Sequence, residues 1–131
     1  MTTQHQVLGR AVTRGQALPL GVDDPIVAAR AVRRALADAG RRAADCEAMA
    51  VASPDTLAPG VLARFARRAL GPHGDRMPVR GVPVLEPDAD ILAARAAAEL
   101  AASGPLHEGV GIAVGLGADG TAVALCLGNP P

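Results

Sequence analysis

The sequence predicts an α/β fold: a mixed five-stranded sheet with helices on both faces, in the element order β-α-β-α-β-α-β-β. Short apolar runs of strand length alternate with longer segments whose apolar residues recur at helical spacing. Strands that are separated by helices imply right-handed crossovers and parallel pairing. The last two apolar runs meet at Asp119-Gly120, a dipeptide suited to a tight hairpin turn, so the hairpin adds one antiparallel strand.

The composition indicates one domain with a core of small side chains. At 131 residues the chain can bury one core but not two, so we expect a single domain over residues 1–131. Half of the residues are apolar, yet the one aromatic residue is Phe65. Alanine, valine and leucine must therefore build the core, and small side chains let helices and sheet approach closely.

Charge and termini exclude several classes of protein. Thirteen basic residues, all arginine, balance thirteen acidic ones without a basic run, which argues against nucleic acid or an anionic membrane surface as partner. No apolar run approaches the ~20 residues that span a bilayer, and the polar amino terminus lacks the plan of a signal peptide. The distant Cys46 and Cys126 fit a reducing compartment, so we expect a cytoplasmic protein.

The first strand and helix are predicted near the amino terminus. We expect a strand over Val7–Thr13, then a helix that Asp23 or Asp24 caps, Pro25 begins and Gly40 ends. Arginines occupy the solvent side of this helix. Its buried side comprises Ala28, Ala29, Val32, Ala35, Leu36 and Ala39.

The middle of the chain continues the alternation. Ala48–Ala52 is a short continuous apolar run, typical of a strand that is covered on both faces. A helix follows over about Gly60–Leu70, then a strand near Met77–Val84, where Pro78 and Pro83 restrict pairing. The helix is expected to bury Val61, Leu62, Phe65, Ala66 and Ala69.

The third helix, Asp90–Ala102, has almost no polar face. Within it only Asp90, Arg95 and Glu99 interrupt alanine, leucine and isoleucine, whereas an amphipathic surface helix shows a full polar side. Both sides of this helix should therefore find cover. The closing strands are expected over Val110–Gly115 and Thr121–Leu127.

Four passages carry a resemblance to a known family. Ala31–Gly40 is similar to an ALADAG-type helix, Ala44–Val51 to an ADIDAV strand entry, Leu70–Val79 to an FGPRGVPV turn, and Gly115–Leu125 to a GFGGTNAALV hairpin. In this order they resemble the carboxyl-terminal half of β-ketoacyl synthases and their inactive chain-length-factor partners, in the thiolase-like superfamily. The resemblance covers about residues 24–127.

The sequence departs from the family where the family does chemistry. The family's cysteine nucleophile lies in an amino-terminal half that these 131 residues do not include. Its two catalytic histidines would fall in Ser53–Thr56 and Glu86–Asp90, and a thiolase cysteine would fall near Ala113; none is present. Carboxylates in place of neutral donors would repel a developing oxyanion. The resemblance therefore implies a catalytically degenerate half-domain.

In the family, two halves pack with their third helices between the sheets. A half-domain alone would expose an apolar patch, which a two-fold homodimer or a ketosynthase-type partner would cover. We expect the interface to include Ile91, Leu92, Ala94 and Ala98. The expected function is association within acyl or polyketide metabolism, with an acyl thioester or acyl carrier protein as ligand or partner and with no cofactor.

The alternative is a small enzyme of acyl or polyketide metabolism whose site is rebuilt from carboxylates. Asp55, Asp88 and Asp90 are its catalytic candidates, because α/β sites gather at strand ends and helix starts. In either case we expect ligand-binding residues at the same edge of the sheet: Ser53, Glu86, Gly115 and Gly117. For Asp88 and Asp90, capping of the helix is the expected role.

Other motifs indicate structure more than chemistry. The histidines are expected to be solvated turn residues, and no Cys or His spacing predicts a metal site. Cys126 should be buried, whereas Cys46 could be partly exposed and reactive beside an arginine. The spacing Gly115-x-Gly117-x-x-Gly120 resembles a dinucleotide fingerprint but opens no helix, so we interpret it as a hairpin that needs close backbone approach.

Overall fold

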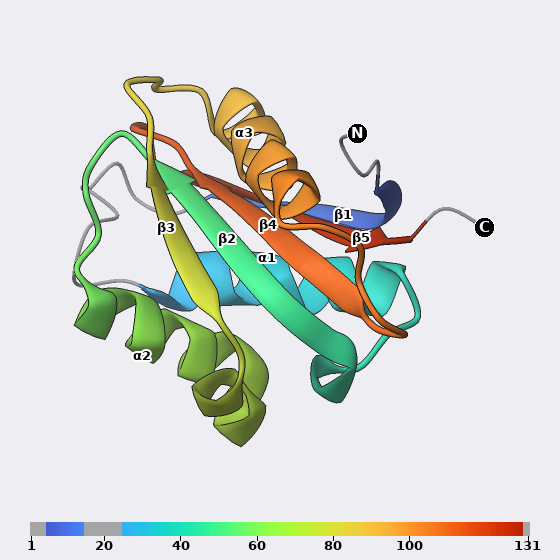
Figure 1. The fold of residues 1–131 in the computed structure, drawn as a ribbon. Coiled ribbons are helices and arrows are strands. Elements are labelled where there is room, and N and C mark those ends of the chain that lie inside the picture. The colour runs from blue at the N-terminus through green and yellow to red at the C-terminus, as the bar shows by residue number, and fades with distance from the viewer. Residues whose placement is uncertain (1–4, 15–24, 130–131) are drawn as a thin grey trace.

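One mixed sheet of five strands organises the molecule (Figure 1). The computed structural model describes residues 5–14 and 25–129. In space the strand order is β1-β5-β4-β2-β3; β2 is parallel to β3 and β4, and β5 is antiparallel to β4 and β1. The strands are β1 (Gln6–Arg14), β2 (Cys46–Ser53), β3 (Val79–Pro83), β4 (Val110–Leu116) and β5 (Thr121–Gly128). The predicted order of elements and the mixed sheet are confirmed.

Three helices cover the two faces of this sheet unequally. α1 (Pro25–Asp38) and α2 (Pro59–Leu70) lie on one face, while α3 (Ala89–Ala102) lies alone on the other (Figure 1). Two short 3₁₀ turns follow these helices in the sequence: η1 (Ala43–Asp45) lies between α1 and β2, and η2 (Gly71–Arg76) lies between α2 and β3. None of the helices described for residues 5–14 and 25–129 is long and apolar enough to span a membrane.

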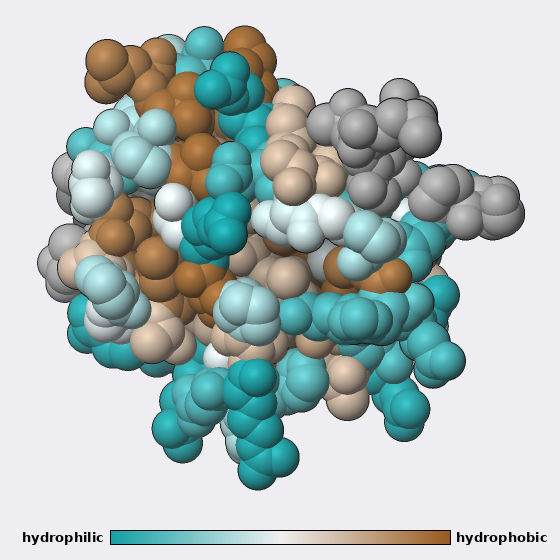
Figure 2. Space-filling model, in the orientation of Figure 1, coloured by the Kyte–Doolittle hydropathy of each residue, from teal (hydrophilic) through white to brown (hydrophobic). Residues whose placement is uncertain are grey.

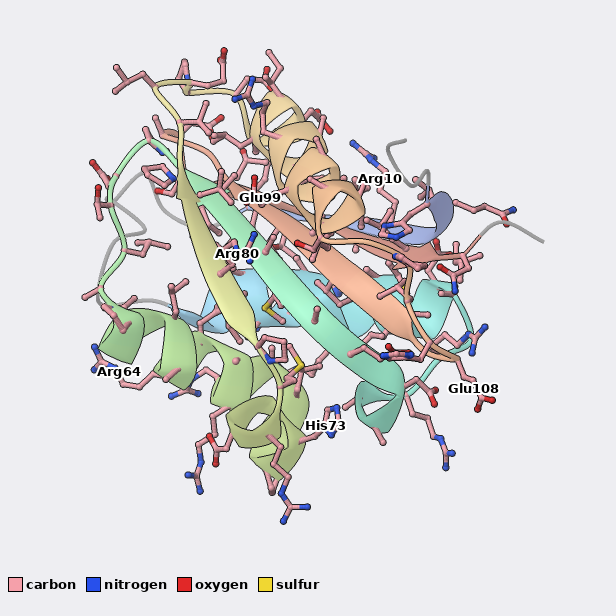
Figure 3. All side chains as sticks on the ribbon, viewed as in Figure 1. Arg10, Arg64, His73, Arg80, Glu99 and Glu108 are labelled. Carbon is pink, nitrogen blue, oxygen red and sulfur yellow. The ribbon has the colours of Figure 1, made fainter. Side chains whose placement is uncertain are left out.

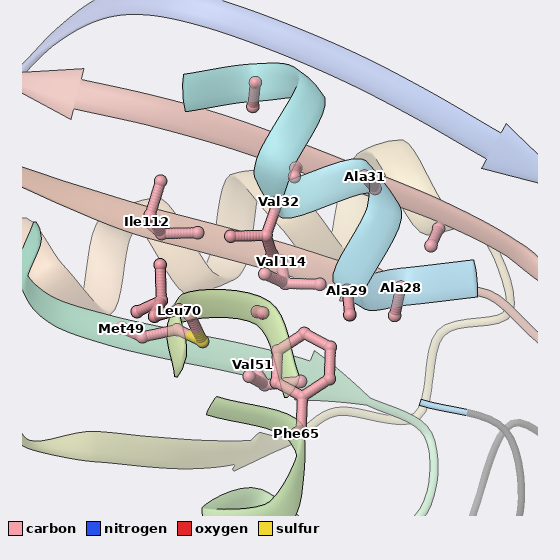
Figure 4. Close-up of a cluster of buried hydrophobic side chains, with 14 of the residues drawn as sticks. Ala28, Ala29, Ala31, Val32, Met49, Val51, Phe65, Leu70, Ile112 and Val114 are labelled. Atoms are coloured by element: carbon pink, nitrogen blue, oxygen red, sulfur yellow. The ribbon is translucent and has the colours of Figure 1, made fainter. Parts of the chain in front are cut away.

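Larger side chains fill the space between the sheet and the α1–α2 layer. Val32, Met49 and Ile112 are at most 1% exposed and lie in one cluster with Phe65 (Figure 4). The predicted buried side of α1 is confirmed, except that Ala39 is half-buried. Val61 of α2 is also half-buried rather than buried, because it lies at the margin between the sheet side and the solvent side of the helix.

The two central strands present small residues to α3, and leucines of α3 and β5 complete this layer. Ala50 and Ala113 are fully buried beneath this helix. A Cβ added to Gly115 would collide with the α3 backbone at Ala89 and Ala93, so α3 lies directly on β4. The outer side of α3 faces solvent in the single chain, with Ile91 49% exposed. Within the described residues, α3 is therefore covered on the side that faces the sheet and open on the other, so the expectation that both of its sides are covered is met on one side only.

Local signals set the limits of the helices. α1 begins at Pro25, as predicted, and its last residue is Asp38. Gly40, the predicted stop, follows with a φ of 67°, in the left-handed region that favours glycine. The amide of Arg41 donates to the carbonyl of Leu36 at 2.9 Å and that of Gly40 to Ala37 at 3.0 Å, which closes the last turn. The predicted cap at Asp23 or Asp24 lies outside the described residues.

β1 is longer than predicted and irregular. Its pairing with β5 shifts between Val7 and Gly9, and a Cβ on Gly9 would meet the α1 backbone at Ala35. The glycine that interrupts the strand pattern therefore lets α1 approach β1. Thr13, the buried polar residue of this strand, donates its hydroxyl to the carbonyl of Val27 at 2.7 Å.

Candidate functional site

The predicted site residues meet at one edge of the sheet. Because β2, β3 and β4 are parallel, their carboxyl ends lie at the same edge, where α3 also begins (Figure 1). The segment between β3 and α3 is hydrogen-bonded to the end of β2 and to the turn that follows β4. The amide of Val84 donates to the carbonyl of Ser53 at 2.9 Å, and the amide of Ala118 donates to the carbonyl of Pro87 at 3.0 Å.

Ser53 is the buried polar residue of this edge. It ends β2, is 5% exposed, and its Oγ accepts the amide of Asp55 at 3.1 Å. That bond uses the hydroxyl as an acceptor, so the hydroxyl hydrogen can still be donated to another group. Asp55 itself is exposed in the loop after β2.

Asp88 caps α3, as predicted. Its Oδ1 accepts the amides of Asp90 at 2.8 Å and Ile91 at 3.3 Å. Glu86 Oε1 in turn accepts the amide of Asp88 at 3.1 Å. These carboxylates are placed where the helix dipole favours negative charge. The amides that would bind an external anion at this helix start are therefore engaged by the chain's own side chain.

Asp90 lies on the flank of α3 and forms an ion pair across to β1. Its Oδ1 is 2.6 Å from Nη2 of Arg10, and both side chains are more than half exposed. A second pair, Arg80 with Glu99 at 2.7 Å, joins the opposite flank of α3 to β3 (Figure 3). The two ion pairs connect α3 to β1 and to β3, and both carboxylates are engaged by an arginine.

Gly115 and Gly117 make room for the start of α3. A Cβ on Gly117 would lie 3.1 Å from the Cβ of Ala89 and 3.1 Å from Oδ1 of Asp119, and Gly115 is closed off by the helix backbone. The predicted close backbone approach is thus confirmed. A ligand-binding role for these glycines stays a prediction.

Carboxylates gather at this edge of the sheet. Glu86 and Asp88 both accept backbone amides before α3, and a carboxylate destabilises a nearby oxyanion. The predicted catalytic carboxylates Asp88 and Asp90 are occupied by capping and ion pairing.

The predicted interface residues divide between the two sides of α3. Ile91, Ala94 and Ala98 are exposed on its outer side. Leu92 is fully buried against the sheet, so its assignment to an interface between protomers is wrong. The reason is geometric, since residues 91 and 92 lie about 100° apart around a helix with 3.6 residues per turn.

Both cysteines are buried, at 1% exposure or less. Burial raises the pKa of the Cys46 thiol to about 12 and that of the Cys126 thiol to about 11, and the thiolate is the reactive form. The prediction for Cys126 is confirmed, whereas the suggestion that Cys46 is partly exposed is wrong. His73 Nε2 lies 2.6 Å from the carbonyl oxygen of Cys46, so this histidine is a half-buried packing residue rather than a solvated one.

Glu47 is a structural residue that the sequence did not reveal. Its carboxylate accepts the amides of His107, Glu108 and Gly109 in the loop before β4. Burial acts to raise the pKa of this carboxyl, but the hydrogen bonds outweigh it, so the pKa lies below its usual value. No local pattern predicts a contact across 60 residues. Among the described residues, no group of three or more His, Cys, Asp and Glu side chains could hold a metal ion.

Comparison with known proteins identifies the fold. No protein-family model and no curated protein matches the sequence, but solved structures match the fold. A priming β-ketosynthase from the R1128 polyketide biosynthetic pathway superposes with a TM-score of 0.63 at 13% identity, over 98% of this chain and 51% of that chain. The fold is that of a thiolase-like half-domain.

Two further structures match the half-domain. 3-Oxoacyl-[acyl-carrier-protein] synthase III from Aquifex aeolicus VF5 has a TM-score of 0.62 at 11% identity, over 97% of this chain and 54% of that chain. The oxazolomycin ketosynthase domain OzmH KS7 from Streptomyces albus JA3453 has a TM-score of 0.66 at 16% identity, over 97% and 30%. The half-domain therefore spans about half the length, or less, of the proteins it resembles.

Proposed function

We propose that this chain is a catalytically degenerate ketosynthase-like half-domain that acts by association in acyl or polyketide metabolism. The observation that carries the proposal is the outer side of α3, which the described residues leave open. The solved structures that share the fold contain about as much chain again outside the matched region. A second half-domain, packed on α3, is the cover that such a fold suits.

The open face is apolar at its centre and charged at its margins. Ile91 on α3 is 49% exposed and Val12, beside Arg10 on β1, is 38% exposed. Ala94 and Ala98, one helical turn apart, present a smooth surface that allows a second helix to approach closely. Arg95 is also exposed there, so the outer side has one cation within an otherwise apolar stripe.

A second copy of the chain is the simplest cover. A two-fold axis through the outer side of α3 uses the same patch twice and closes the assembly. A ketosynthase-type protein offers a related surface and is the other arrangement that the proposal allows. In both, the carboxyl edge with Ser53 and Glu86 lies beside the shared face, where an acyl thioester or an acyl carrier protein could be bound.

The oligomeric state tests the association. We expect size-exclusion chromatography with light scattering to give twice the mass of the chain at micromolar concentration. Ala98→Glu should weaken the dimer more than about 100-fold, because the interface would bury an unpaired carboxylate at a cost of several kcal/mol. Ala63→Glu is the matched control, since Ala63 is an exposed alanine of α2 on the other face, and it should leave the dimer intact.

If light scattering shows a monomer, binding to a ketosynthase-type protein is tested next. The chain would then be titrated with a ketosynthase-type protein encoded beside it in the genome, and Ala98→Glu should abolish binding while Ala63→Glu does not. A well-folded monomer that also ignores that protein would overturn the proposal. Equal effects of the two substitutions would overturn the assignment of the interface to α3.

Thioester turnover tests the degeneracy. We expect no thiol release above background when the purified chain is incubated with acetyl or malonyl thioesters. Turnover that is lost in Asp88→Asn and kept in Asp119→Asn would establish the carboxylate-based enzyme instead. No contact in the described residues favours that enzyme, because Asp88 and Asp90 already cap the helix and form an ion pair.

A further inference from the structure

Charge is distributed unequally between the two helical layers. Residues 25–76, which include α1 and α2, contain nine arginines and five acidic residues. Residues 77–129, which include α3, contain two arginines and six acidic residues. Because α1 and α2 lie on one face of the sheet, the outer surface of these two helices is basic although the net charge of the chain is zero. On the α3 side, Asp90 and Glu99 are paired with Arg10 and Arg80.

Four arginines form two rows on the basic side. Arg30 and Arg34 are one turn apart on α1, and Arg64 and Arg68 are one turn apart on α2. All four are exposed, and Arg64 extends from α2 into solvent (Figure 3). Like charges at this spacing destabilise a helix by about 0.2–0.5 kcal/mol per pair. The chain has this unfavourable spacing on two neighbouring helices.

The carboxylates of the same layer are engaged elsewhere. Asp38 accepts the backbone amide of Arg10 at 3.0 Å, Asp45 accepts that of Arg42 at 2.9 Å, and Asp75 is paired with Arg67 at 3.2 Å. Asp55 is exposed in the loop after β2. Within residues 25–76 as described, Arg67 is the arginine that forms an ion pair. The two rows thus present guanidinium groups that no described carboxylate neutralises.

We infer that the outer surface of α1 and α2 docks a protein that presents an acidic helix. α1 and α2 are in contact on the same face of the sheet, so the two rows of exposed arginines lie on one surface. A helix with carboxylates every fourth residue has the same spacing as each row, and guanidinium binds carboxylate through paired hydrogen bonds. A nucleic acid fits less well, because the zero net charge of the chain removes long-range attraction to a polyanion.

The test uses an alanine-rich helical peptide of about 20 residues, long enough to be helical, with glutamate at every fourth position and a fluorescent label. Anisotropy titration at low salt should give saturable binding that weakens as ionic strength rises. Arg64→Glu and Arg34→Glu should each weaken binding by about fivefold or more. Arg14→Glu reverses one exposed arginine at the end of β1 and should change binding less than twofold.

Each other outcome counts against the inference. No saturable binding at low salt would overturn it, as would an equal loss of affinity in Arg14→Glu. Tighter binding of a DNA duplex of similar length than of the peptide would overturn the assignment to a protein. Circular dichroism establishes that each variant is folded, and Arg64→Gln repeats the test without a new negative charge. The inference is independent of the association through α3, which lies on the opposite face.

Discussion

The two faces of the sheet are covered by helices in different ways, and β4 contributes to both. Ile112 and Val114 point into the core beneath α1 and α2, while Ala113 and Gly115 lie under α3. On the first face, β2 and β4 present Met49, Val51, Ile112 and Val114 to the helices. On the second face the same two strands present alanine and glycine, and the buried leucines come from α3 and β5. The small residues of the two central strands let the helix backbone lie close to the sheet.

This difference separates a complete core from an incomplete layer. On the α1–α2 face the solvent side carries arginines, which water solvates in the single chain. On the α3 face the solvent side is Ile91 and alanine, with Val12 beside it. The same sheet therefore has one face with a polar outer surface and one with an exposed apolar surface.

The largest expected effect distinguishes two isoleucines. Ile112→Ala should lower the free energy of unfolding by about 3 kcal/mol, because the side chain is fully buried and its removal leaves a cavity. Ile91→Ala removes the same atoms from the outer side of α3 and should cost less than about 0.5 kcal/mol in the monomer. Urea denaturation monitored by circular dichroism measures both, and equal losses would contradict the contrast between the faces.

Two glycines of β4 test how closely α3 lies on the sheet. Gly115→Ala should destabilise the fold by about 2 kcal/mol, since the new methyl group collides with the backbone of α3. Gly111→Ala faces the same helix, but its Cβ would lie 3.4 Å from Leu100 and 3.5 Å from Leu106, which is ordinary contact. We expect it to change stability by less than about 0.5 kcal/mol. Thermal denaturation of the two variants measures this difference. Equal losses of stability would mean that the close approach of the α3 backbone to Gly115 is not what requires glycine there.

A smaller effect concerns the loop that joins α3 to β4. Glu47→Gln should cost about 1 kcal/mol at pH 7, because an amide replaces one of the acceptor oxygens that three backbone amides require. The folded pKa of Glu47 lies below the ordinary 4.5, so its stabilisation is present above pH 4.5 and is lost as the pH falls through the depressed value.

Urea denaturation at pH 7 and at pH 3 measures this dependence. The difference between wild type and Glu47→Gln should shrink at the lower pH. Glu108→Gln changes an exposed carboxylate within the same loop and should change stability at pH 7 by less than about 0.5 kcal/mol. A constant difference at both pH values would mean that the carboxylate charge does not hold the loop.

The smallest effect belongs to the ion pair that joins α3 to β1. A double-mutant cycle of Arg10→Gln and Asp90→Asn should give a coupling energy below about 1 kcal/mol, because both side chains are largely exposed. The coupling should disappear near 1 M salt. A coupling above about 2 kcal/mol would show that charge, rather than the fit of small residues, fixes α3 on the sheet.

Local signals explain what could be predicted from the sequence. Pro25 begins α1, Gly40 follows its last turn and Asp88 caps α3, and each of these roles depends on residues within one or two turns. The meeting of Ser53 with the segment before α3 also follows from the sequence, since parallel strands bring their carboxyl ends to one edge. Leu92 was assigned to the wrong side of α3 because a helix with apolar residues all around it does not indicate which side faces the sheet.

Contacts between distant residues explain what could not be predicted. The burial of Cys46 and its neighbour His73 depends on how η2 packs beneath β2 across 27 residues. The bonds from Glu47 to residues 107–109 join segments that no short pattern relates. The basic surface of α1 and α2 was also invisible in the balanced total, because it appears only when the helices are assigned to faces (Figure 1). Hydrophilic residues gather at the lower end of the view in Figure 2, where α2 and η2 lie.

The edges of the sheet limit how copies of this chain can assemble. β3 has five residues and ends on Pro83, which has no N–H to donate. At the opposite edge, β1 is irregular near Gly9 and has arginines at positions 10 and 14. Irregularity, charge and proline are the features by which natural sheets resist strand-by-strand growth. Concentrated solutions should therefore stay free of fibrils even when the apolar face of α3 is unoccupied.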